Sequence, residues 1–479
     1  MLDPRHDPNG AAPARRAAPR AKFKPVHVAP VVRPMSTAEV AMAARRNVLS
    51  TIPGLAYVQP IVSGTTAGLR WHHVTDPEAL KRILLDRVDA YPKSKTTQRL
   101  LRPAIGSSIF TAEGEEWRWQ RRAAAPIFNH RKMVALSPMM SAAGARTADR
   151  LCAAVDRGYG GVGVACVMEE MVTATFEVVC DALLAGGDGL DRREIGASIT
   201  RYLNTIGRVS LLDILNAPNW VPRPAQLTNR GVMDRTVEMV DALIADRRVA
   251  FDRGERAGDL LDYMLEAADP DSGQRMDDAT LRNNLLSFIV AGHETTALAL
   301  AWSLYLLAND PEAQERAAGE ARAAIADGPA TAEQLERMPY LRRVIDEAMR
   351  LFPPAAMLGR DAREPDMLSG REIRPGDTVI LPIYCLHRHE RLWEDPHRFD
   401  PDNFLPERVK ARSRFAYLPF GAGPRVCIGM SFALMEAAII LASVLARLRV
   451  EPRRNLRPEP VLTMTLRPKG GMPLRIRKR

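Results

Sequence analysis

A short segment near the carboxyl end of the chain, Phe420–Gly429, contains a cysteine and an arginine among several glycines. Its glycines and Pro424 predict a tight loop, and Cys427 stands at the end of that loop, directly before a long apolar stretch. If this stretch is a helix, its unpaired N–H groups and positive dipole end stabilise a thiolate and lower the pKa of the cysteine. Arg425 adds positive charge nearby. These features indicate a metal ligand or a nucleophile. The alternative, a buried structural thiol, explains neither the glycines nor the arginine.

A second group of polar residues interrupts the most apolar stretch of the chain, residues 280–309. Apolar residues on nearly every side predict a long helix in the centre of a large protein. Glu294 lies beside Thr295 and Thr296 in the middle of this stretch, and such groups are costly to bury without a role. Gly292 removes a side chain where another group must come close. The alternative is a polar kink in a core helix.

A third pattern is a charged pair at helical spacing. Glu347 and Arg350 are three residues apart, so a helix places both side chains on one face. Surface pairs of this kind are common, so the pattern is weak alone.

Together these segments resemble the sequence signatures of the cytochrome P450 superfamily, and they occur in the family's order. The haem-binding signature FxxGxRxCxG is matched at every fixed position, by Phe420, Gly423, Arg425, Cys427 and Gly429. The other segments resemble AGxxT at Ala291, Gly292 and Thr295, ExxR at Glu347 and Arg350, WxxxR at Trp117 and Arg121, and PERF at 404–408 with Val409 in place of an aromatic residue.

The resemblance implies haem b held between the long helix and the cysteine loop. Cys427 is then the proximal thiolate ligand of the iron, which favours O–O cleavage. Phe420 packs beside the sulfur. The implied partners of the haem propionates are Trp117, Arg121, Arg360 and Arg425.

On the other side of the haem, the resemblance assigns roles to the polar residues of the long helix. Ala291 and Gly292 lie against the cofactor, Thr295 hydrogen-bonds dioxygen, and Glu294 relays protons. Behind the haem, the implied structural triad is Glu347, Arg350 and Arg408.

The implied activity is that of a monooxygenase that inserts one atom of O2 into an apolar organic substrate. The segments His387-Arg388 and Phe399–Arg408 are similar to those of soluble bacterial enzymes related to fatty-acid hydroxylases, so a fatty acid or another long lipid is expected. Because the chain ends soon after the last helix, electrons are expected from a separate ferredoxin or flavodoxin-type donor. A peroxygenase, or an isomerase or dehydratase, on the same fold tends to lack the acid–alcohol pair. A non-enzymatic haem sensor or carrier would need an output module.

Composition narrows the remaining choices. The 479 residues carry a formal charge of +10, with much of the excess near the two ends. We expect no nucleic-acid binding, because there is no zinc finger and no basic patch interleaved with aromatic residues. Five cysteines without a CxxC pair indicate a reducing compartment, and we expect a cytoplasmic protein. No run of 18 apolar residues predicts a transmembrane segment.

The predicted architecture is one domain, mainly α with a small β component, with the cytochrome P450 fold. Residues 1–35 read as a disordered basic tail rich in Pro and Ala, and 36–479 as a single catalytic domain with Ser36 capping its first helix. The clearest predicted helices are 280–309, 311–326, 339–351 and 428–446, and the predicted strands are 55–61, 68–74, 378–382 and 461–466.

Basic residues flank the motifs that surround the cysteine. The basic residues expected to face solvent there and to attract an acidic electron donor are Arg118, Arg122, Lys410, Arg412 and Arg414.

Overall fold

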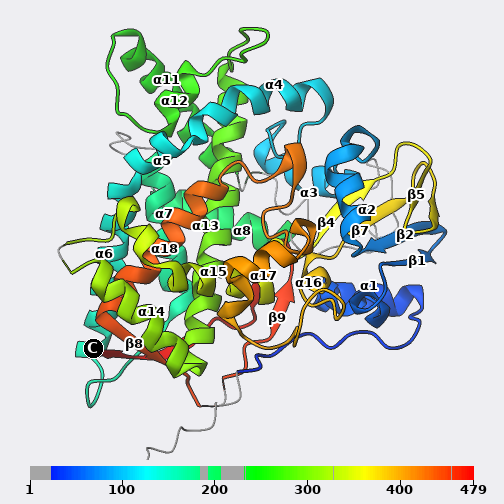
Figure 1. The fold of residues 1–479 in the computed structure, drawn as a ribbon. Coiled ribbons are helices and arrows are strands. Elements are labelled where there is room, and N and C mark those ends of the chain that lie inside the picture. Colours follow the sequence, from blue (N-terminus) through cyan, green and yellow to red (C-terminus); the bar gives the residue numbers. More distant parts are fainter. Residues whose placement is uncertain (1–22, 184–191, 207–230, 232, 327, 455) are drawn as a thin grey trace, which may run out of the picture.

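The computed structural model describes residues 23–183, 192–206, 231, 233–326, 328–454 and 456–479. The described chain is mainly helical, and a smaller group of strands lies to one side of the helices (Figure 1), which confirms the predicted fold class. The longer helices are α1 (Thr37–Arg46), α3 (Lys95–Ile105), α4 (Gly114–Ala124), α6 (Ser137–Asp156), α7 (Val167–Leu183), α8 (Arg192–Ile206), α11 (Asp234–Asp252), α13 (Asp278–Asn309), α14 (Pro311–Ala324), α15 (Pro339–Leu351) and α18 (Met430–Arg447). The shorter helices are α2 (Pro77–Lys81), α5 (His130–Ala135), α12 (Leu260–Glu266), α16 (Ile383–Leu386) and α17 (Pro406–Ala411).

The strands form small sheets. A four-stranded sheet has the order β1-β2-β7-β4, in which β2 and β7 are parallel and the other neighbours antiparallel. Its strands are β1 (Ile61–Thr66), β2 (Leu69–Val74), β7 (Thr378–Leu381) and β4 (Leu358–Asp361). The remaining strands are β3 (Gly163–Cys166), β8 (Leu448–Glu451) and β11 (Pro473–Lys478) in one sheet, and the pairs β5 (Asp366–Leu368) with β6 (Arg371–Ile373) and β9 (Pro460–Leu462) with β10 (Leu466–Pro468).

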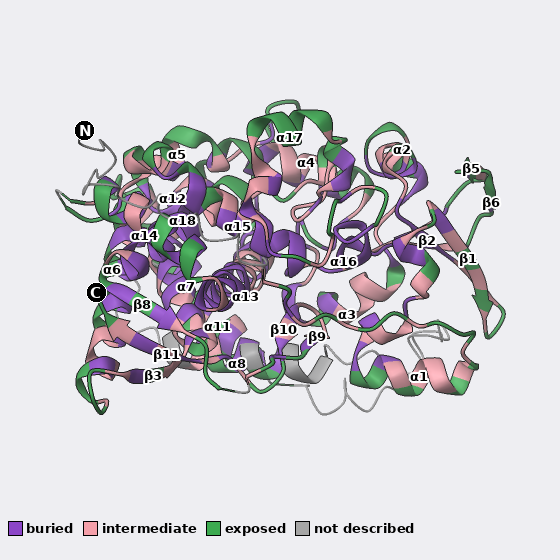
Figure 2. Cartoon of the chain, turned by 60° about the horizontal axis from the view of Figure 1, so that its bottom comes forward, coloured by how far each residue is buried: buried purple, intermediate pink, exposed green. Residues whose placement is uncertain are grey.

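The central helix α13 forms the core, as predicted. Asp277 caps its start by accepting a hydrogen bond from the Thr280 amide at 2.8 Å, and Pro311 begins the next helix. Figure 2 shows α13 nearly end-on, coloured as buried and surrounded by other elements. It packs against α7, α15 and α18, so Glu294 and Thr296 in its middle are buried, whereas Thr295 is half-buried.

Two of the predicted strands are wrong. Residues Gly54–Tyr57 form a 3-10 helix, and β1 begins only at Ile61, because Pro53 and Gly54 break the extended run. Residues 461–466 span the turn of the β9–β10 hairpin and therefore belong to two short strands. The predictions at 68–74 and 378–382 match β2 and β7.

Residues before Ser36 already pack on the domain, which corrects the predicted end of the tail. Ser36 does cap α1, in a capping box with Glu39. However, the amide of Val28 donates to the Tyr384 hydroxyl at 3.1 Å, and Phe23 makes an edge-to-face contact with Tyr305. Residues 23–35 therefore pack on the domain, whereas 1–22 lie outside the described residues.

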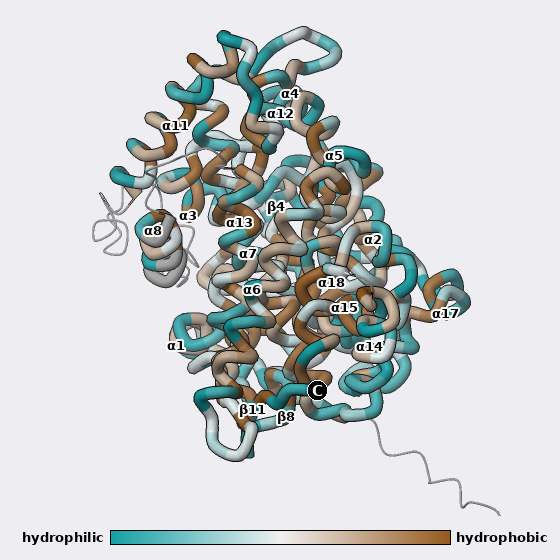
Figure 3. The backbone as a smooth tube through the Cα atoms, turned by 90° about the vertical axis from the view of Figure 1, so that its left-hand side faces the viewer, coloured by the Kyte–Doolittle hydropathy of each residue, from teal (hydrophilic) through white to brown (hydrophobic). Residues whose placement is uncertain are grey.

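Two helices are long and apolar enough to cross a membrane by length and composition, α13 and α18. Figure 3 shows apolar stretches along both. The apolar windows are 72% and 61% buried inside the protein, and core helices pass the same test.

Candidate functional site

Backbone contacts fix the loop that carries Cys427. Gly423 has a φ of +71°, and a Cβ there would lie 1.8 Å from the carbonyl oxygen of Leu84, so only glycine fits. The amide of Cys427 donates to the carbonyl of Phe420 at 2.9 Å, and Gly429 caps α18. The Cys427 side chain is exposed, which favours a ligating thiol over a packed structural one.

The electrostatic environment of Cys427 differs from the expected one. Although solvent reaches the residue, surrounding protein atoms desolvate the thiol and raise its pKa, while the Gly429 amide and the charge of Arg121 act to lower it. The predicted lowering of the pKa is therefore wrong for the free thiol. Arg425 points elsewhere and donates to the carbonyls of Val88 at 3.0 Å and Tyr91 at 2.9 Å. A metal cation deprotonates a coordinating thiol outright, so thiolate ligation still fits.

Basic side chains from four separate segments converge near this loop: Lys93, Arg121, Arg360 and Arg425. We call these four residues the cation cluster. Burial lowers the pKa of Lys93 to about 7, and the other three charges act in the same direction. Glu113 is the carboxylate that faces them, and it accepts hydrogen bonds from Arg425 Nη2 at 2.6 Å and from the Lys93 amide at 2.9 Å. The ring of Trp117 lies 5.3 Å from the Arg425 guanidinium.

The cation cluster fits the carboxylate edge of a haem. The Nε atoms of Arg360 and Arg425 are buried without a hydrogen-bond partner among the described residues. Four basic groups facing one carboxylate retain excess positive charge, and arginine donors suit the two propionates of a haem. The structure thus brings together the predicted propionate partners Trp117, Arg121, Arg360 and Arg425, and it adds Lys93 and Glu113, which carry no sequence signal.

The acid and the alcohol in α13 are held by different partners. Glu294 is buried, pairs with Arg467 Nε, and accepts a hydrogen bond from Thr465 Oγ1 at 3.1 Å. Thr295 is half-buried, and its hydroxyl donates to the carbonyl of Ala291 at 2.7 Å. Both groups are held by hydrogen bonds or an ion pair, which can break and re-form when a proton moves or a ligand binds.

Gly292 has a packing role in this structure. A Cβ at this position would lie 3.3 Å from Val179 Cγ2, so the missing side chain lets α7 approach α13. That Gly292 also lies against the cofactor and dioxygen stays a prediction.

The predicted triad is right in two of its three members. Glu347 and Arg350 are fully buried and form two hydrogen bonds of 2.7 Å. Arg408 does not join them: its side chain is 44% exposed, and its nearest partners are Asn403 at 3.4 Å and Asp400 at 3.8 Å.

Asn403 and Arg412 occupy the place predicted for Arg408. Asn403 is buried and donates to Glu347 Oε1 at 3.3 Å. Arg412 stacks 3.7 Å above the Trp393 ring and donates to the Asn403 carbonyl at 3.1 Å. The prediction for Arg408 is wrong because the chain turns through residues 401–404 before PERV, which places α17 at the surface.

The predicted basic docking face is largely neutralised. Arg118 pairs with Asp89 and Glu115, and Arg122 pairs with Asp269 and Asp271. Arg412 is half-buried and held against Trp393 and Asn403. Lys410 and Arg414 are exposed and have no ion-pair partner among the described residues.

Another buried acid was missed by sequence reasoning. Glu436 on α18 is fully buried, and neither of its carboxyl oxygens has a hydrogen-bond partner among the described residues. Burial raises its pKa well above the usual range, and Thr296 of α13 is the polar group that acts on it. An acid inside a long apolar helix was the available signal.

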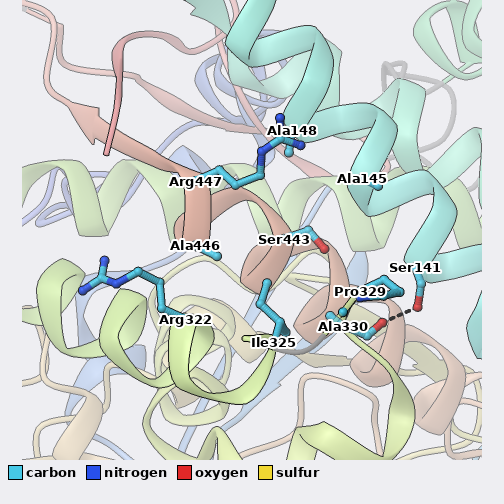
Figure 4. Close-up of a pocket in the computed structure, with 11 residues that line it drawn as sticks. Ser141, Ala145, Ala148, Arg322, Ile325, Pro329, Ala330, Ser443, Ala446 and Arg447 are labelled. Carbon is cyan, nitrogen blue, oxygen red and sulfur yellow. Dashed lines mark hydrogen bonds between the residues drawn. The ribbon is translucent and has the colours of Figure 1, made fainter.

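A pocket of about 370 Å³ lies elsewhere, between α6, α18 and the segment after α14 (Figure 4). None of the predicted site residues lines it. It therefore does not belong to the site around Cys427.

The fold and the site together fit a haem protein with a thiolate ligand. The chain belongs to the cytochrome P450 family, whose model matches residues 57–474. It is 30% identical to cyclooctatin synthase of Streptomyces melanosporofaciens over 83% of this chain and 84% of that protein, and 30% identical to cytochrome P450 4A11 of Homo sapiens over 84% and 79%. The crystal structure of the cytochrome P450DA heme domain matches with a TM-score of 0.76 at 26% identity, covering 88% of this chain and 90% of that one. The chain is thus a P450 monooxygenase with a haem cofactor.

Proposed function

We propose that this monooxygenase hydroxylates a fatty acid or another long lipid with O2, and that it receives electrons from a separate ferredoxin or flavodoxin-type protein in the cytoplasm. The observation that carries the O2 dependence is the pair Glu294 and Thr295 in the middle of α13. When bound, the haem supplies the iron at which dioxygen is activated.

The residues of this chain supply orientation and protons. Cys427 supplies the thiolate, and the cation cluster orients the carboxylate edge of the cofactor. The Thr295 hydroxyl can break its hydrogen bond to the Ala291 carbonyl and donate instead to a ligand bound beside α13. Glu294 can accept and release a proton beside it. General acid–base help of this kind contributes about 10²–10⁴-fold to a rate.

The apolar character of α13 supports a lipid-like substrate. After Arg282, Glu294 is the only Asp, Glu, Lys or Arg in this helix, and it is already paired with Arg467. A charged substrate group would find no free counter-charge on α13. A relative 30% identical over 86% of this chain is named cyclooctat-9-en-7-ol 5-monooxygenase.

The test is a screen for substrate-induced shifts of the haem Soret band, with fatty acids, terpenes and steroids of increasing length. We expect fatty acids to bind more tightly as the chain lengthens. Product formation is then measured with O2 and a ferredoxin or flavodoxin system, and separately with hydrogen peroxide alone. Turnover with peroxide but not with O2, or shifts with small polar compounds only, would contradict the proposal.

A further inference from the structure

The C-terminal β-hairpin contacts the polar stretch of α13 through three polar groups that are bonded to one another. Arg467 on β10 pairs through Nε with Glu294 Oε1. Thr465, in the turn before β10, donates to the same oxygen at 3.1 Å. Arg467 Nε also donates to Thr465 Oγ1 at 3.2 Å. Glu294 is thus held on one oxygen by two groups that also hold each other.

The hairpin is itself fixed to the core, so this arrangement is rigid. Trp302, two helical turns beyond Glu294 on α13, donates from Nε1 to the carbonyl of Leu466 at 3.2 Å. The amide of Leu466 donates to the carbonyl of Pro354 at 3.0 Å. Leu466, which lies between Thr465 and Arg467, is therefore bonded through both its amide and its carbonyl, and Arg467 cannot shift along α13 without breaking these bonds.

The two oxygens of Glu294 differ in their surroundings. Oε1 accepts from Thr465 and faces Arg467. Oε2 is buried and has no hydrogen-bond partner among the described residues. A buried acceptor without a hydrogen-bond partner costs free energy, so its presence in the folded protein calls for a functional explanation.

We propose that Arg467 is a positioning residue for the monooxygenase reaction, which holds Glu294 by Oε1 and leaves Oε2 as the oxygen that takes up and releases protons beside Thr295. This inference rests on the proposed O2-dependent function. The proton that binds Oε2 leaves from the same atom, so Glu294 returns to its starting state in each cycle. Arg467 itself transfers no proton.

The first measurement tests the contact without turnover. Thermal unfolding is followed for the haem-loaded wild type, Arg467→Gln, Glu294→Gln and the double variant. We expect the double variant to lose clearly less thermal stability than the two single losses added together, because both variants break one interaction. Additive losses would overturn the contact on which the inference depends.

The second measurement tests the positioning role. We expect Arg467→Gln to lower the product yield per NAD(P)H consumed by roughly 10–100-fold, since displacement of a reacting group by about 1 Å has effects of this size. Hydrogen peroxide should rise in proportion, the solvent isotope effect of D2O should change, and the Soret-shift affinity for substrate should stay the same. Arg467→Lys should restore most of the yield. Arg475→Gln on β11, an exposed arginine 3.9 Å from Glu451, is the matched control and should behave as wild type.

The outcomes separate this inference from the proposed function. Absence of product from the wild type contradicts the proposed function. A wild-type yield in Arg467→Gln overturns the positioning role. An equal loss of yield and of substrate affinity that Arg467→Lys does not restore also overturns it, because that pattern indicates a structural role alone.

Discussion

The loop around Cys427 and the polar stretch of α13 hold their reactive groups in opposite ways. In the loop, backbone geometry determines the position: Gly423 leaves no room for a Cβ beside the Leu84 carbonyl, and the Cys427 amide is bonded to Phe420. In α13, Thr295 and Glu294 are held by side-chain bonds to Ala291 and to Arg467. The loop thus fixes a thiol through its backbone, whereas α13 holds a hydroxyl and a carboxylate through side-chain bonds that can rearrange.

This contrast predicts two kinds of mutational effect. Substitutions in or behind the loop should abolish the thiolate signature of the bound cofactor or strongly lower the stability of the fold. Changes in α13 should leave the cofactor in place and alter how well electrons are used. The predictions below test this division, from the largest expected effect to the smallest.

Replacing Cys427 should abolish the thiolate signature. In Cys427→Ala, the carbon monoxide complex of the reduced protein should lose its red-shifted Soret band completely, because no other described cysteine lies in this loop. Cys152→Ala, a change at a half-buried cysteine, should keep the band. A retained band in Cys427→Ala would show that the ligand assignment is wrong.

Breaking the buried pair behind the loop should destabilise the protein strongly. Glu347→Gln leaves the buried Arg350 charge without its carboxylate, and uncompensated buried charges cost roughly 3–5 kcal/mol. Thermal or denaturant unfolding measures the loss. Glu372→Gln removes an exposed pair with Arg374 and should leave the midpoint unchanged. Equal midpoints for the two variants would contradict the burial argument.

Removing the alcohol in α13 should impair chemistry and spare the cofactor. Thr295→Ala should reduce product formation by about 10²–10⁴-fold, with electrons diverted to hydrogen peroxide, while haem content and substrate affinity stay unchanged. The matched control is Ser303→Ala, because Ser303 makes the same type of backbone bond, to Ala299 at 2.7 Å on the same helix. The prediction fails if product per NAD(P)H is the same in both variants.

Haem affinity should depend on the protonation of Lys93. Burial lowers the pKa of this lysine to about 7. The propionates favour the charged ammonium, so haem binding takes up a proton above this pH, and affinity should fall by at most about tenfold per pH unit. Titration of the haem-free protein between about pH 7 and pH 9 measures this fall. Lys93→Met should flatten the profile, and an unchanged slope in this variant would exclude Lys93 as its origin.

The smallest expected effect concerns the electron donor. Because Arg118 and Arg122 are already paired with acids, Lys410 and Arg414 are the exposed basic residues of the predicted face that have no ion-pair partner among the described residues. Lys410→Glu should slow haem reduction a few-fold at low salt, and the difference should shrink as the Debye length falls from about 10 Å at 0.1 M to about 3 Å at 1 M. A salt-independent rate in both proteins would argue against electrostatic docking here.

Sequence reasoning identified the segments that have strong local patterns. The apolar run of α13, the proline-bounded α15 and the glycine loop before Cys427 depend on interactions between near neighbours, and their places were predicted. The surroundings of Arg408 and Arg412 depend on which distant segment packs against them, and these were predicted incorrectly. Lys93, Glu113 and Arg467 act through partners hundreds of residues away in some cases, such as the 312 residues between Glu113 and Arg425. No local spacing encodes such pairs.

The cation cluster also links the lifetime of the polypeptide to the supply of its cofactor. Its four members come from positions 93, 121, 360 and 425, so long loops must close before like charges meet in a desolvated place. Haem, whose two propionates carry two negative charges, binds the folded chain and so shifts the folding equilibrium toward the folded state by mass action. We expect a newly made chain without haem to unfold locally at the cation cluster more often and to expose more cleavage sites to proteases. Cells starved of haem should therefore contain less of this protein, and not merely an inactive form of it.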